Sequence, residues 1–504
     1  MQVGDTRFIS YSSAVHYGEA GDQASFKGKR AINQLLWGDY ARVLEVDGSW
    51  VKVRARGRNG WLRRENLQEN RILEVNFVDI GQGDGCHIQT PDDKAIVIDA
   101  GEGDNMYRFL RWRFGRFSHP FTFESFVISH PDSDHYYGFR PLFEEPNVRV
   151  DTVFHNGLVE QKQAGKKTLG DEVKIGRTRY ITGLVRTKDE LKAITDDDER
   201  RGSYWYPNML KTAVDSGRVT DIRGAFAPTD WQAKAYLPGY APADNRGLTL
   251  QLLGPVPADL AGEHGVPWLG SAGETKNGHS VVLLLEIGGI KMLLGGDLNE
   301  PSQEYLLEHY TGLSAHPKSV DDEKLLVDEA RKTFEVDIAK ACHHGSAHVS
   351  PHFLMATNPL ATVISSGDAE PHSHPRPDTL GLIGKHSRGA RPLIFSTELA
   401  RSGNEHIKHP NLVRRELRAN MEAELAIIND AQSTDLQKSK AEERLEKHLS
   451  VIQRSVANYG MINVLTDGTR LIVAQRLEQE RSKSKRWDIY HFEPDSHGRL
   501  TFVP

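Results

Sequence analysis

The chain has 504 residues, of which 38% are apolar and 26% are charged, and its mean hydropathy is −0.52. This composition excludes a membrane protein and a disordered chain. There are 63 lysines and arginines against 69 aspartates and glutamates, giving a net charge of −6, so no overall basic field attracts nucleic acid or anionic lipid. The longest apolar stretch, residues 281–294, contains Glu286 and Lys291 and is shorter than the roughly 18 residues of a membrane span.

Two further features concern the cellular compartment. Residues 1–7 lack the apolar segment of a secretory signal. Cys86 and Cys342 are the only cysteines, too few for a disulfide scaffold. We therefore expect a cytoplasmic protein without a membrane partner, and at about 150 residues per domain the length predicts about three domains.

The first predicted domain, residues 1–70, consists of an N-terminal arm and a small β-barrel. Residues 40–46 and 49–54 alternate between apolar and polar side chains around the turn at Asp47-Gly48, and a third strand follows Asn59-Gly60. An Asp-Gly turn between alternating segments is typical of a β-hairpin. Residues 36–67 resemble a bacterial Src-homology-3-like domain; the alternative is a hairpin appended to the main domain.

The second predicted domain spans residues 71–405 and has the alternation of strands and helices typical of an α/β fold. Strands are expected at 72–79, 95–99, 123–129, 248–253, 280–287 and 291–294. Residues 160–240 are charged and lack a clear strand pattern, so we interpret them as a partly helical insertion.

The third predicted domain, residues 406–504, combines helices and strands. Apolar residues recur at helical spacing through residues 411–457, with a capping point near Thr434, which predicts a helical hairpin. Strands are expected at 461–465, 471–474 and 487–492.

The strongest chemical signal is His-Pro-Asp-Ser-Asp-His at 130–135, directly after an apolar strand. It places His130, Asp132, Asp134 and His135 within one short loop. Imidazole nitrogen and carboxylate oxygen together suit Zn²⁺ or Mn²⁺. So many candidate ligands in six residues are difficult to explain as a solvated surface turn.

Three later segments supply further candidate ligands. Each adjoins a predicted strand, and the candidates are His279, Asp297, His343 and His344. Glycines beside several of them let the backbone approach a metal centre closely. For the position of His279, the neighbouring Asn277 and the more distant His155 are alternatives.

Together these segments resemble the metallo-β-lactamase superfamily, and within it the soluble hydrolase domain of the ComEC competence proteins. The resemblance runs from residue 71 to 400 and covers the insertion poorly. It is carried by VDIGQGD at 78–84, IDAG at 98–101, SHPDSDH at 129–135, LGGD at 294–297, HHGS at 343–346, SSG at 365–367 and His374-Pro375. It implies an α/β fold, namely an αββα sandwich with the metals at one edge of two sheets, here with a small N-terminal β-barrel and a C-terminal helical hairpin plus strands.

The resemblance also implies two divalent metal ions, Zn²⁺ or Mn²⁺. Its implied ligands are His130, Asp132 and His279 for the first ion, Asp134, His135 and His343 for the second, and Asp297 as a bridge. Asp99 would orient a ligand loop. The superfamily's commoner motif has histidine at the position of Asp132, and the harder carboxylate favours Mn²⁺ or mixed occupancy.

Two metal ions that share a hydroxide supply a nucleophile at neutral pH and neutralise charge on a phosphoryl group. We therefore expect a hydrolase of phosphodiester bonds, with Asp134 and His344 as catalytic residues. The resemblance to the ComEC hydrolase domain implies foremost a DNA or RNA nuclease. Ser346 and His374 would bind substrate, and His344 or His374 would protonate the leaving oxygen; a turn role for Ser346 and a loop role for His374 are the alternatives. Other hypotheses are a hydrolase of a cyclic nucleotide, a phosphocholine ester or a lactone, and an interaction module of a defence or DNA-processing complex.

Candidate partner surfaces lie outside these motifs. The barrel carries basic residues interleaved with Trp50 and Trp61, namely Lys52, Arg54, Arg56, Arg58, Arg63 and Arg64. They predict contact with nucleic acid or a protein partner, the alternative being an exposed barrel face, and the helical hairpin is a second candidate for docking a protein. A phosphate track is a third candidate surface, along Lys340, Arg376, Lys385, Arg388 and Arg391, the alternative being solvated surface charges.

Overall fold

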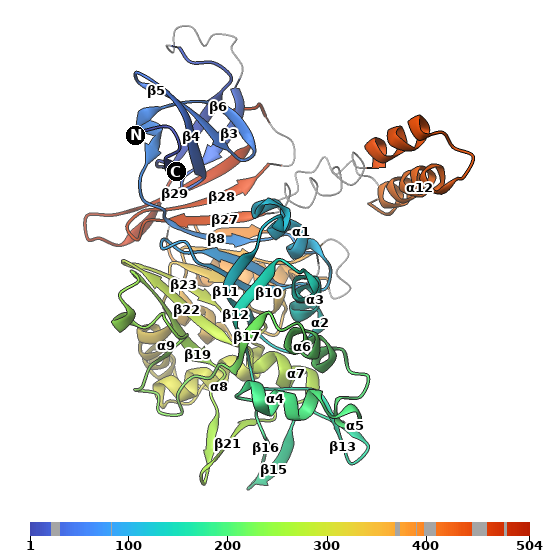
Figure 1. Cartoon of the computed structure of the whole chain (residues 1–504). Coiled ribbons are helices and arrows are strands. Elements are labelled where there is room, and N and C mark those ends of the chain that lie inside the picture. The colour runs from blue at the N-terminus through green and yellow to red at the C-terminus, as the bar shows by residue number, and fades with distance from the viewer. Residues whose placement is uncertain are drawn as a thin grey trace.

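Two large β-sheets with helices beside them form the main body of the chain (Figure 1). The computed structural model describes residues 1–21, 31–81, 83–367, 373–389, 391–397, 410–445, 461–477 and 481–504. Helices and strands alternate through the middle of the chain, which confirms the predicted mixed α/β class.

The first large sheet has ten strands. From one edge to the other they are β17 (Val219–Gly224), β12 (Val148–His155), β11 (Phe121–Ile128), β10 (Ala95–Ala100), β9 (Gly85–Gln89), β8 (Leu73–Phe77), β27 (Ile462–Thr466), β28 (Leu471–Arg476), β29 (Trp487–Pro494) and β30 (Leu500–Val503). β10, β11, β12 and β17 are parallel neighbours. β27 pairs antiparallel with β8, so the red C-terminal strands lie beside a blue one (Figure 1). The sheet therefore crosses the boundary predicted at residue 406.

The second large sheet has seven strands. They are β18 (Ala235–Tyr236), β19 (Leu248–Gly254), β22 (Val282–Ile287), β23 (Ile290–Leu294), β24 (Ile338–Lys340), β25 (Ala361–Ile364) and β26 (Leu393–Ser396). One buried apolar cluster takes Val75 and Ile88 from the first sheet and Leu250 and Leu285 from the second. Each such side chain contributes about 1.5 to 3 kcal/mol on burial, so this cluster holds the two sheets together.

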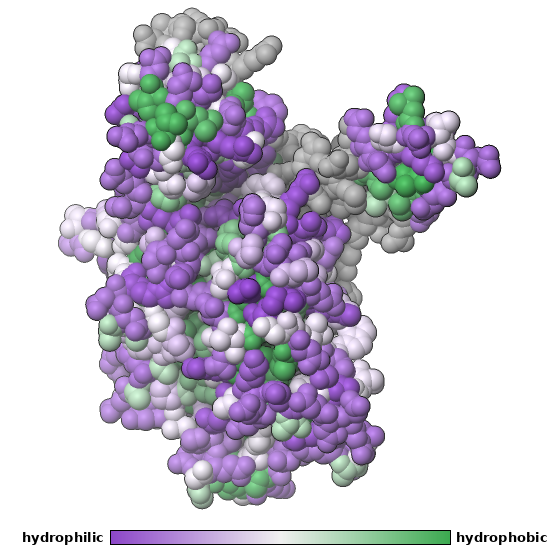
Figure 2. All heavy atoms as spheres, viewed as in Figure 1, coloured by the Kyte–Doolittle hydropathy of each residue, from purple (hydrophilic) through white to green (hydrophobic). Residues whose placement is uncertain are grey.

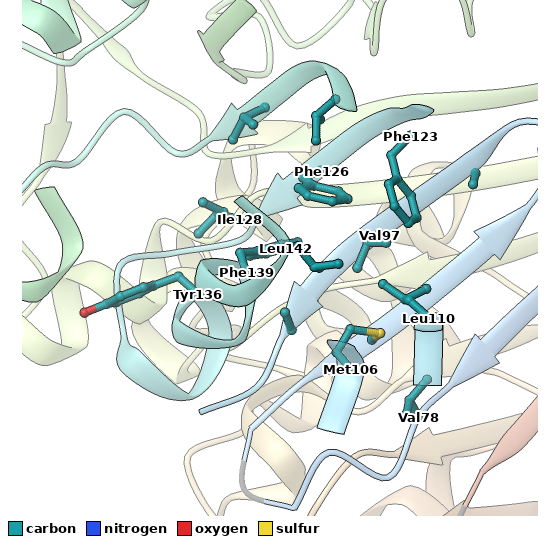
Figure 3. Close-up of a cluster of buried hydrophobic side chains, with 14 of the residues drawn as sticks. Val78, Val97, Met106, Leu110, Phe123, Phe126, Ile128, Tyr136, Phe139 and Leu142 are labelled. Carbon is teal, nitrogen blue, oxygen red and sulfur yellow. The ribbon is translucent and has the colours of Figure 1, made fainter. Parts of the chain in front are cut away.

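Helices pack beside each sheet and complete two further apolar clusters. The first sheet packs with α1 (Asn105–Arg113), α2 (Ser133–Tyr136), α3 (Arg140–Glu144), α4 (Lys188–Thr195) and α6 (Trp205–Asp215). Phe126 and Phe139 lie with ring centroids 4.8 Å apart in this cluster, whereas the Tyr136 hydroxyl points away from it (Figure 3). The second sheet packs with α8 (Glu300–Thr311), α9 (Val320–Phe334) and α10 (Pro351–Thr357).

Local signals explain where these helices begin and end. The Asn299 side chain accepts a hydrogen bond from Ser302 N at the start of α8, and Gly312 ends the helix with a φ of 69°. Asparagine at the N-cap and glycine in the left-handed region after the last turn are the preferred residues there. α11 (Pro377–His386) begins with a proline, which fits the first turn of a helix.

Residues 160–240 contain strands as well as helices, contrary to the prediction. Among them are β13 (Gln161–Gln163), β14 (Lys166–Thr168), β15 (Asp171–Ile175) and β16 (Thr178–Thr182), together with α4, α5 (Asp198–Arg201), α6 and β17. β16 also pairs with β21 (Glu263–Pro267), which pairs with β20 (Ala258–Leu260). The side chains of β14 and β15 are mostly exposed, so these strands lack the apolar alternation that predicts a half-buried strand.

The N-terminal residues form a third, seven-stranded sheet. Its strands, in order, are β3 (Ala31–Leu36), β2 (Ser13–Tyr17), β6 (Arg58–Arg63), β5 (Trp50–Ala55), β4 (Tyr40–Asp47), β1 (Thr6–Ile9) and β7 (Leu67–Gln68). It contacts the C-terminal strands: the Tyr11 hydroxyl donates to Glu493 Oε1 at 3.0 Å, and the Arg470 guanidinium lies 4.3 Å from the Tyr11 ring centre. Apolar side chains gather on the visible face of this sheet around β4 and β5 (Figure 2).

Several basic residues of this sheet have intramolecular partners. Arg56 Nε lies 2.7 Å from Asp39 Oδ2, and its guanidinium stacks 5.0 Å from the Trp487 ring centre. The Arg63 guanidinium lies 4.5 Å from the Trp50 ring centre. Part of the predicted basic surface therefore stabilises the fold.

The region of the predicted helical hairpin is partly described. α12 (Pro410–Asn429) is followed by a second helical segment at 435–445, and Arg444 Nε donates to Glu424 Oε1 at 2.7 Å between them. Residues 446–457 of the predicted hairpin lie outside the described residues. Within the described part of the chain, none of the helices combines the length and the apolar character needed to cross a bilayer.

Candidate metal centre

The loop that follows β11 lies beside the end of β10. Asp99 is the next-to-last residue of β10, and its Oδ1 accepts a hydrogen bond from Ser129 N at 2.7 Å. Its Oδ2 accepts from Ser129 Oγ at 2.6 Å and lies 2.9 Å from His135 Nδ1. Because β10 and β11 are parallel, their carboxyl ends meet at one edge of the sheet. Asp99 thereby orients the His135 ring and the loop that carries it, as predicted.

The second sheet supplies the opposite wall of the site. Asp297 follows β23 through Gly295-Gly296, and its backbone N–H donates to Ser280 Oγ at 3.1 Å. The parallel neighbour β24 leads to His343 and His344, whose φ values are 49° and 54°. Adjacent non-glycine residues in the left-handed region are uncommon and cost about 1 to 3 kcal/mol each, a strain found mostly at functional sites.

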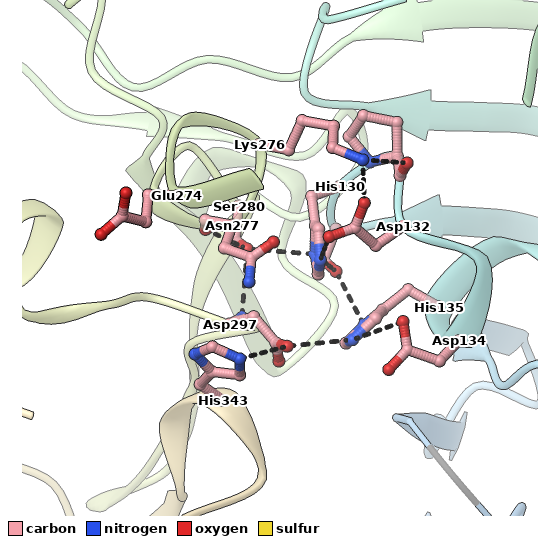
Figure 4. Close-up of polar contacts among 12 residues, drawn as sticks. His130, Asp132, Asp134, His135, Glu274, Lys276, Asn277, Ser280, Asp297 and His343 are labelled. Atoms are coloured by element: carbon pink, nitrogen blue, oxygen red, sulfur yellow. Dashed lines mark hydrogen bonds and ion pairs between the residues drawn. The ribbon is translucent and has the colours of Figure 1, made fainter. Parts of the chain in front are cut away.

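Four side chains from these loops converge on one centre. Asp297 Oδ2 lies 3.2 Å from His135 Nε2 and 3.1 Å from His344 Nε2, and His344 Nε2 lies 3.6 Å from Asp134 Oδ2. The His343 ring is more exposed, and its Nε2 lies 4.0 Å from Asp297 Oδ2. The structure therefore brings His344 deeper into the cluster than His343 (Figure 4 shows the other members).

The chemistry of this cluster fits a metal ion. Asp134, His135 and His344 each offer a ligand atom within 4.8 Å of the others, as do His130, His135 and Asp297. Two buried imidazole nitrogens, His135 Nε2 and His344 Nε2, have no well-aligned hydrogen-bond partner. Buried polar atoms are rarely left in this state unless a ligand takes them. Nitrogen and carboxylate oxygen form the donor set of Zn²⁺ or Mn²⁺ sites.

The electrostatics of the cluster support the same conclusion. Burial disfavours the charged form of Asp297, but His135 and His344 hold the pKa of this carboxyl group well below its ordinary value. Burial likewise disfavours protonated His135, yet Asp297, Asp99 and Asp134 raise its pKa well above the ordinary value. The carboxylates thus stabilise a positive charge in this buried space. A metal ion can supply that charge in place of the imidazole protons.

The neighbouring position around His130 contains a lysine. His130 Nε2 lies 3.6 Å from Asp132 Oδ2. The Lys276 ammonium makes an ion pair with Asp132 (Figure 4). It also lies 3.5 Å from Glu160 Oε1. One terminal atom of the Asn277 amide lies 2.7 Å from Asp132 Oδ2 and 3.3 Å from His130 Nε2. As nitrogen this atom donates to the carboxylate; as oxygen it would be a third ligand beside His130 and Asp132.

The structure places two of the sequence candidates away from the cluster. His279 is buried at the end of α7 (Ala272–Gly278), and its Nε2 lies 2.7 Å from the Pro267 carbonyl oxygen. The His155 Nδ1 accepts a hydrogen bond from Gly157 N at 3.1 Å. Burial lowers the pKa of each of these two histidines to about 4. Of the three alternatives, Asn277 is the one that faces His130.

Asp84 and Lys340 belong to the site but were not among the predicted ligands. The Lys340 ammonium is buried, donates to the Gly296 carbonyl oxygen at 2.8 Å and makes an ion pair with Asp84. Asp84 Oδ1 also lies 3.2 Å from His344 Nδ1. The signal for Asp84 was present in the VDIGQGD segment, whereas Lys340 was predicted to lie in a phosphate track and is instead enclosed.

The two predicted substrate residues, Ser346 and His374, lie in the connections that follow β24 and β25. The Ser346 hydroxyl is buried and accepts a hydrogen bond from His348 N at 3.2 Å, which matches the alternative turn role. The His374 ring lies with its centroid 5.5 Å from that of His343. His374 therefore lies next to the more exposed side of the cluster.

Comparisons with known proteins give a distant relationship. No family model matches the chain. ComE operon protein 3 of Bacillus subtilis (strain 168) is 22% identical over 333 residues, which is 62% of this chain and 31% of that protein. The chain thus matches about a third of its relative's length. A distant relative from a competence operon and a His/Asp cluster able to bind a metal together fit a metal-dependent hydrolase in general.

Proposed function

We propose that this chain is a metal-dependent hydrolase of phosphodiester bonds, foremost a DNA or RNA nuclease. The observation that carries this proposal is the convergence of Asp134, His135, Asp297 and His344 in one buried cluster. Divalent ions bound there would lower the pKa of water and neutralise charge on phosphoryl oxygens. A phosphodiester needs both effects because its anionic oxygens repel an attacking nucleophile.

The geometry suggests a revised assignment of the ligands. For one ion we propose Asp134, His135, Asp297 and His344, with His344 taking the role expected of His343. For the other we propose His130, Asp132 and Asn277, again with Asp297.

The histidines at the rim are then candidates for contact with the substrate. His343 and His374 adjoin each other on the more exposed side of the cluster. We assign them to contact with the phosphodiester, with His374 as the group that protonates the leaving oxygen. His279, which contacts Pro267, takes a structural role.

We also propose that the architecture is the αββα sandwich of the metallo-β-lactamase superfamily, with the N-terminal sheet as a Src-homology-3-like barrel. Three apolar clusters, one between the two large sheets and one on the helix side of each, support this arrangement. The proposed ligands of the loops at 130–135, 297 and 344 follow β11, β23 and β24, which supports a site at one edge of both sheets.

Hydrolysis of bis(p-nitrophenyl) phosphate by Mn²⁺-loaded protein tests the function. We expect turnover by the wild type and by Asp47→Ala, a control at an exposed turn, and a loss of at least about 100-fold in Asp134→Ala. Metal content is measured in parallel. A wild-type protein that binds Mn²⁺ and Zn²⁺ but hydrolyses neither this ester nor an oligonucleotide would refute the proposal.

A further inference from the structure

Aromatic side chains from two distant segments meet beside the metal loop. Tyr136 and Tyr137 follow His135 directly, and Tyr204, Trp205 and Tyr206 begin α6. The rings of Tyr136 and Tyr206 lie 4.7 Å apart and both residues are buried. This inner pair fixes the start of α6 against α2, so the outer aromatic residues are held in place by a packed core.

The outer pair presents an aromatic surface to solvent. The ring centroids of Tyr137 and Trp205 lie 5.4 Å apart with an interplanar angle of 36°. Trp205 is 62% exposed. A tryptophan that is held by a neighbouring ring and still open to solvent can stack on a flat partner at little cost in conformational entropy.

Two lysines connect this aromatic surface with the metal loop. The Lys276 ammonium contacts Asp132 and lies 3.5 Å from Glu160. Glu160 also pairs with Lys167 at 2.8 Å, and the half-exposed Lys167 ammonium lies 5.0 Å from the Tyr204 ring centre. The two lysines and the two carboxylates thus form a chain of ion pairs from the metal loop to the aromatic residues, and Lys167 is the half-exposed cation at its outer end.

We propose that Tyr137 and Trp205 form a stacking subsite for an unpaired nucleobase of a single strand whose phosphodiester lies at the metal centre. This inference rests on the proposed function. Lys167 contributes positive charge for an adjoining phosphate, and the amides at the start of α6, which has no side-chain cap, add partial positive charge. Stacking on exposed aromatic rings beside cations is the common mode of single-strand recognition.

The test compares two labelled oligonucleotides that differ only in their bases. Fluorescein-labelled oligothymidine and an abasic strand of the same length carry the same phosphate charge, and fluorescence anisotropy gives the Kd of each. We expect Trp205→Ala to weaken oligothymidine binding by about 5- to 150-fold, from roughly 1–3 kcal/mol per stacked base. The Kd of the abasic strand should stay the same, and Trp205→Phe should restore most of the affinity.

Trp231→Ala is the matched control because Trp231 is 54% exposed and lies in the loop before β18; it should change neither Kd. Equal wild-type affinity for both strands, or equal losses on single-stranded and duplex DNA in Trp205→Ala, would overturn the subsite. If the wild type still hydrolyses a phosphodiester in that case, the proposed function stands and only the stacking subsite is rejected. A wild type that hydrolyses no phosphodiester at all overturns both proposals.

Discussion

Lys276 places an ammonium group on a carboxylate that a metal ion would use. Its ion pair with Asp132 and its proximity to Glu160 put a lysine charge beside His130. Lys340 also contacts the cluster around Asp297, but it lies 3.6 Å from Oδ1, whereas His135 and His344 lie closest to Oδ2. A metal ion that binds Asp132 must therefore displace an ammonium group, which makes the two candidate sites unequal.

Replacing Lys276 by methionine should strengthen metal binding at Asp132. Without the ammonium, the carboxylate is free, and we expect about a tenfold lower Kd for the weaker metal ion, equivalent to roughly 1.4 kcal/mol. Isothermal titration with Mn²⁺ measures this step. Lys276→Arg keeps the charge and serves as the control; an unchanged second Kd in Lys276→Met would contradict competition at Asp132.

The buried pair of Lys340 and Asp84 should be essential for stability. Lys340→Met leaves the Asp84 carboxylate buried without its cation, and loss of one partner of a buried ion pair costs about 3 to 5 kcal/mol. Urea unfolding of metal-free protein measures this loss. Because Asp84→Asn removes the second charge, the double variant should lose less than the sum of the single variants; strict additivity would show that the pair is not coupled.

The loop from β8 to β9 approaches the metal loop so closely that one of its glycines has no space for a side chain. A Cβ at Gly83 would overlap the carbonyl oxygen of Asp134, and the φ of Gly83 is 98°. Gly81 has a similar φ of 77°, but a Cβ there would meet no atom within 4 Å. Alanine substitutions at Gly81 and Gly83 therefore distinguish the effect of backbone strain from the effect of a clash with the metal loop.

Gly83→Ala should lower metal affinity, whereas Gly81→Ala should not. Both variants carry a left-handed alanine and should lose about 1 kcal/mol of stability from this strain. Only Gly83→Ala pushes against Asp134, so we expect at least a tenfold weaker Zn²⁺ affinity in a chelator competition assay. Equal affinities in the two variants would mean that the contact between these loops does not position Asp134.

Sequence patterns predicted the strands that lead to the candidate ligands. They were less successful at predicting which ligand side chains face each other. The strand before His130 and the hairpin before Asp297 were predicted from apolar runs and glycine turns. The choice between His343 and His344 depends on two left-handed backbone conformations that no local pattern indicates. No helix was predicted at residues 272–278, where the structure has α7. Asn277 lies in this helix and faces His130, whereas His279 directly follows it and contacts the Pro267 carbonyl oxygen.

Across the whole molecule, the least predictable feature is the joining of distant segments. β27 pairs with β8 although the two strands lie at opposite ends of the main body in sequence. The N-terminal sheet then packs against these C-terminal strands through Tyr11 and Glu493. Both β8 and β27 were predicted from their own residues, but such long-range partners are selected by tertiary packing rather than by local sequence.

The stability of the metal-free protein should fall as the pH drops from 7 to 5. Burial lowers the pKa of His155 and His279 to about 4, below the ordinary value near 6.5, so only the unfolded chain gains these protons in that range. Each histidine should therefore cost about 2 kcal/mol between pH 7 and pH 5. Unfolding free energies in EDTA at both pH values measure the change.

His155→Gln and His279→Gln serve as the test variants for this pH dependence. Each should remove its own share of the loss, whereas substitution of His119, which is exposed, should leave the difference unchanged. If the loss between pH 7 and pH 5 is the same in the wild type and in both glutamine variants, these two histidines do not remain neutral in the folded protein.

The central claim is that the cluster around Asp297 holds a divalent metal ion. Anomalous diffraction at the zinc edge, from crystals grown with Zn²⁺, tests it most directly. We predict a peak about 2.0 to 2.2 Å from ligand atoms of Asp134, His135, Asp297 and His344, with any second peak between His130 and Asp132. A peak coordinated by His279, or no peak near Asp297 in protein that has bound zinc, would contradict this claim.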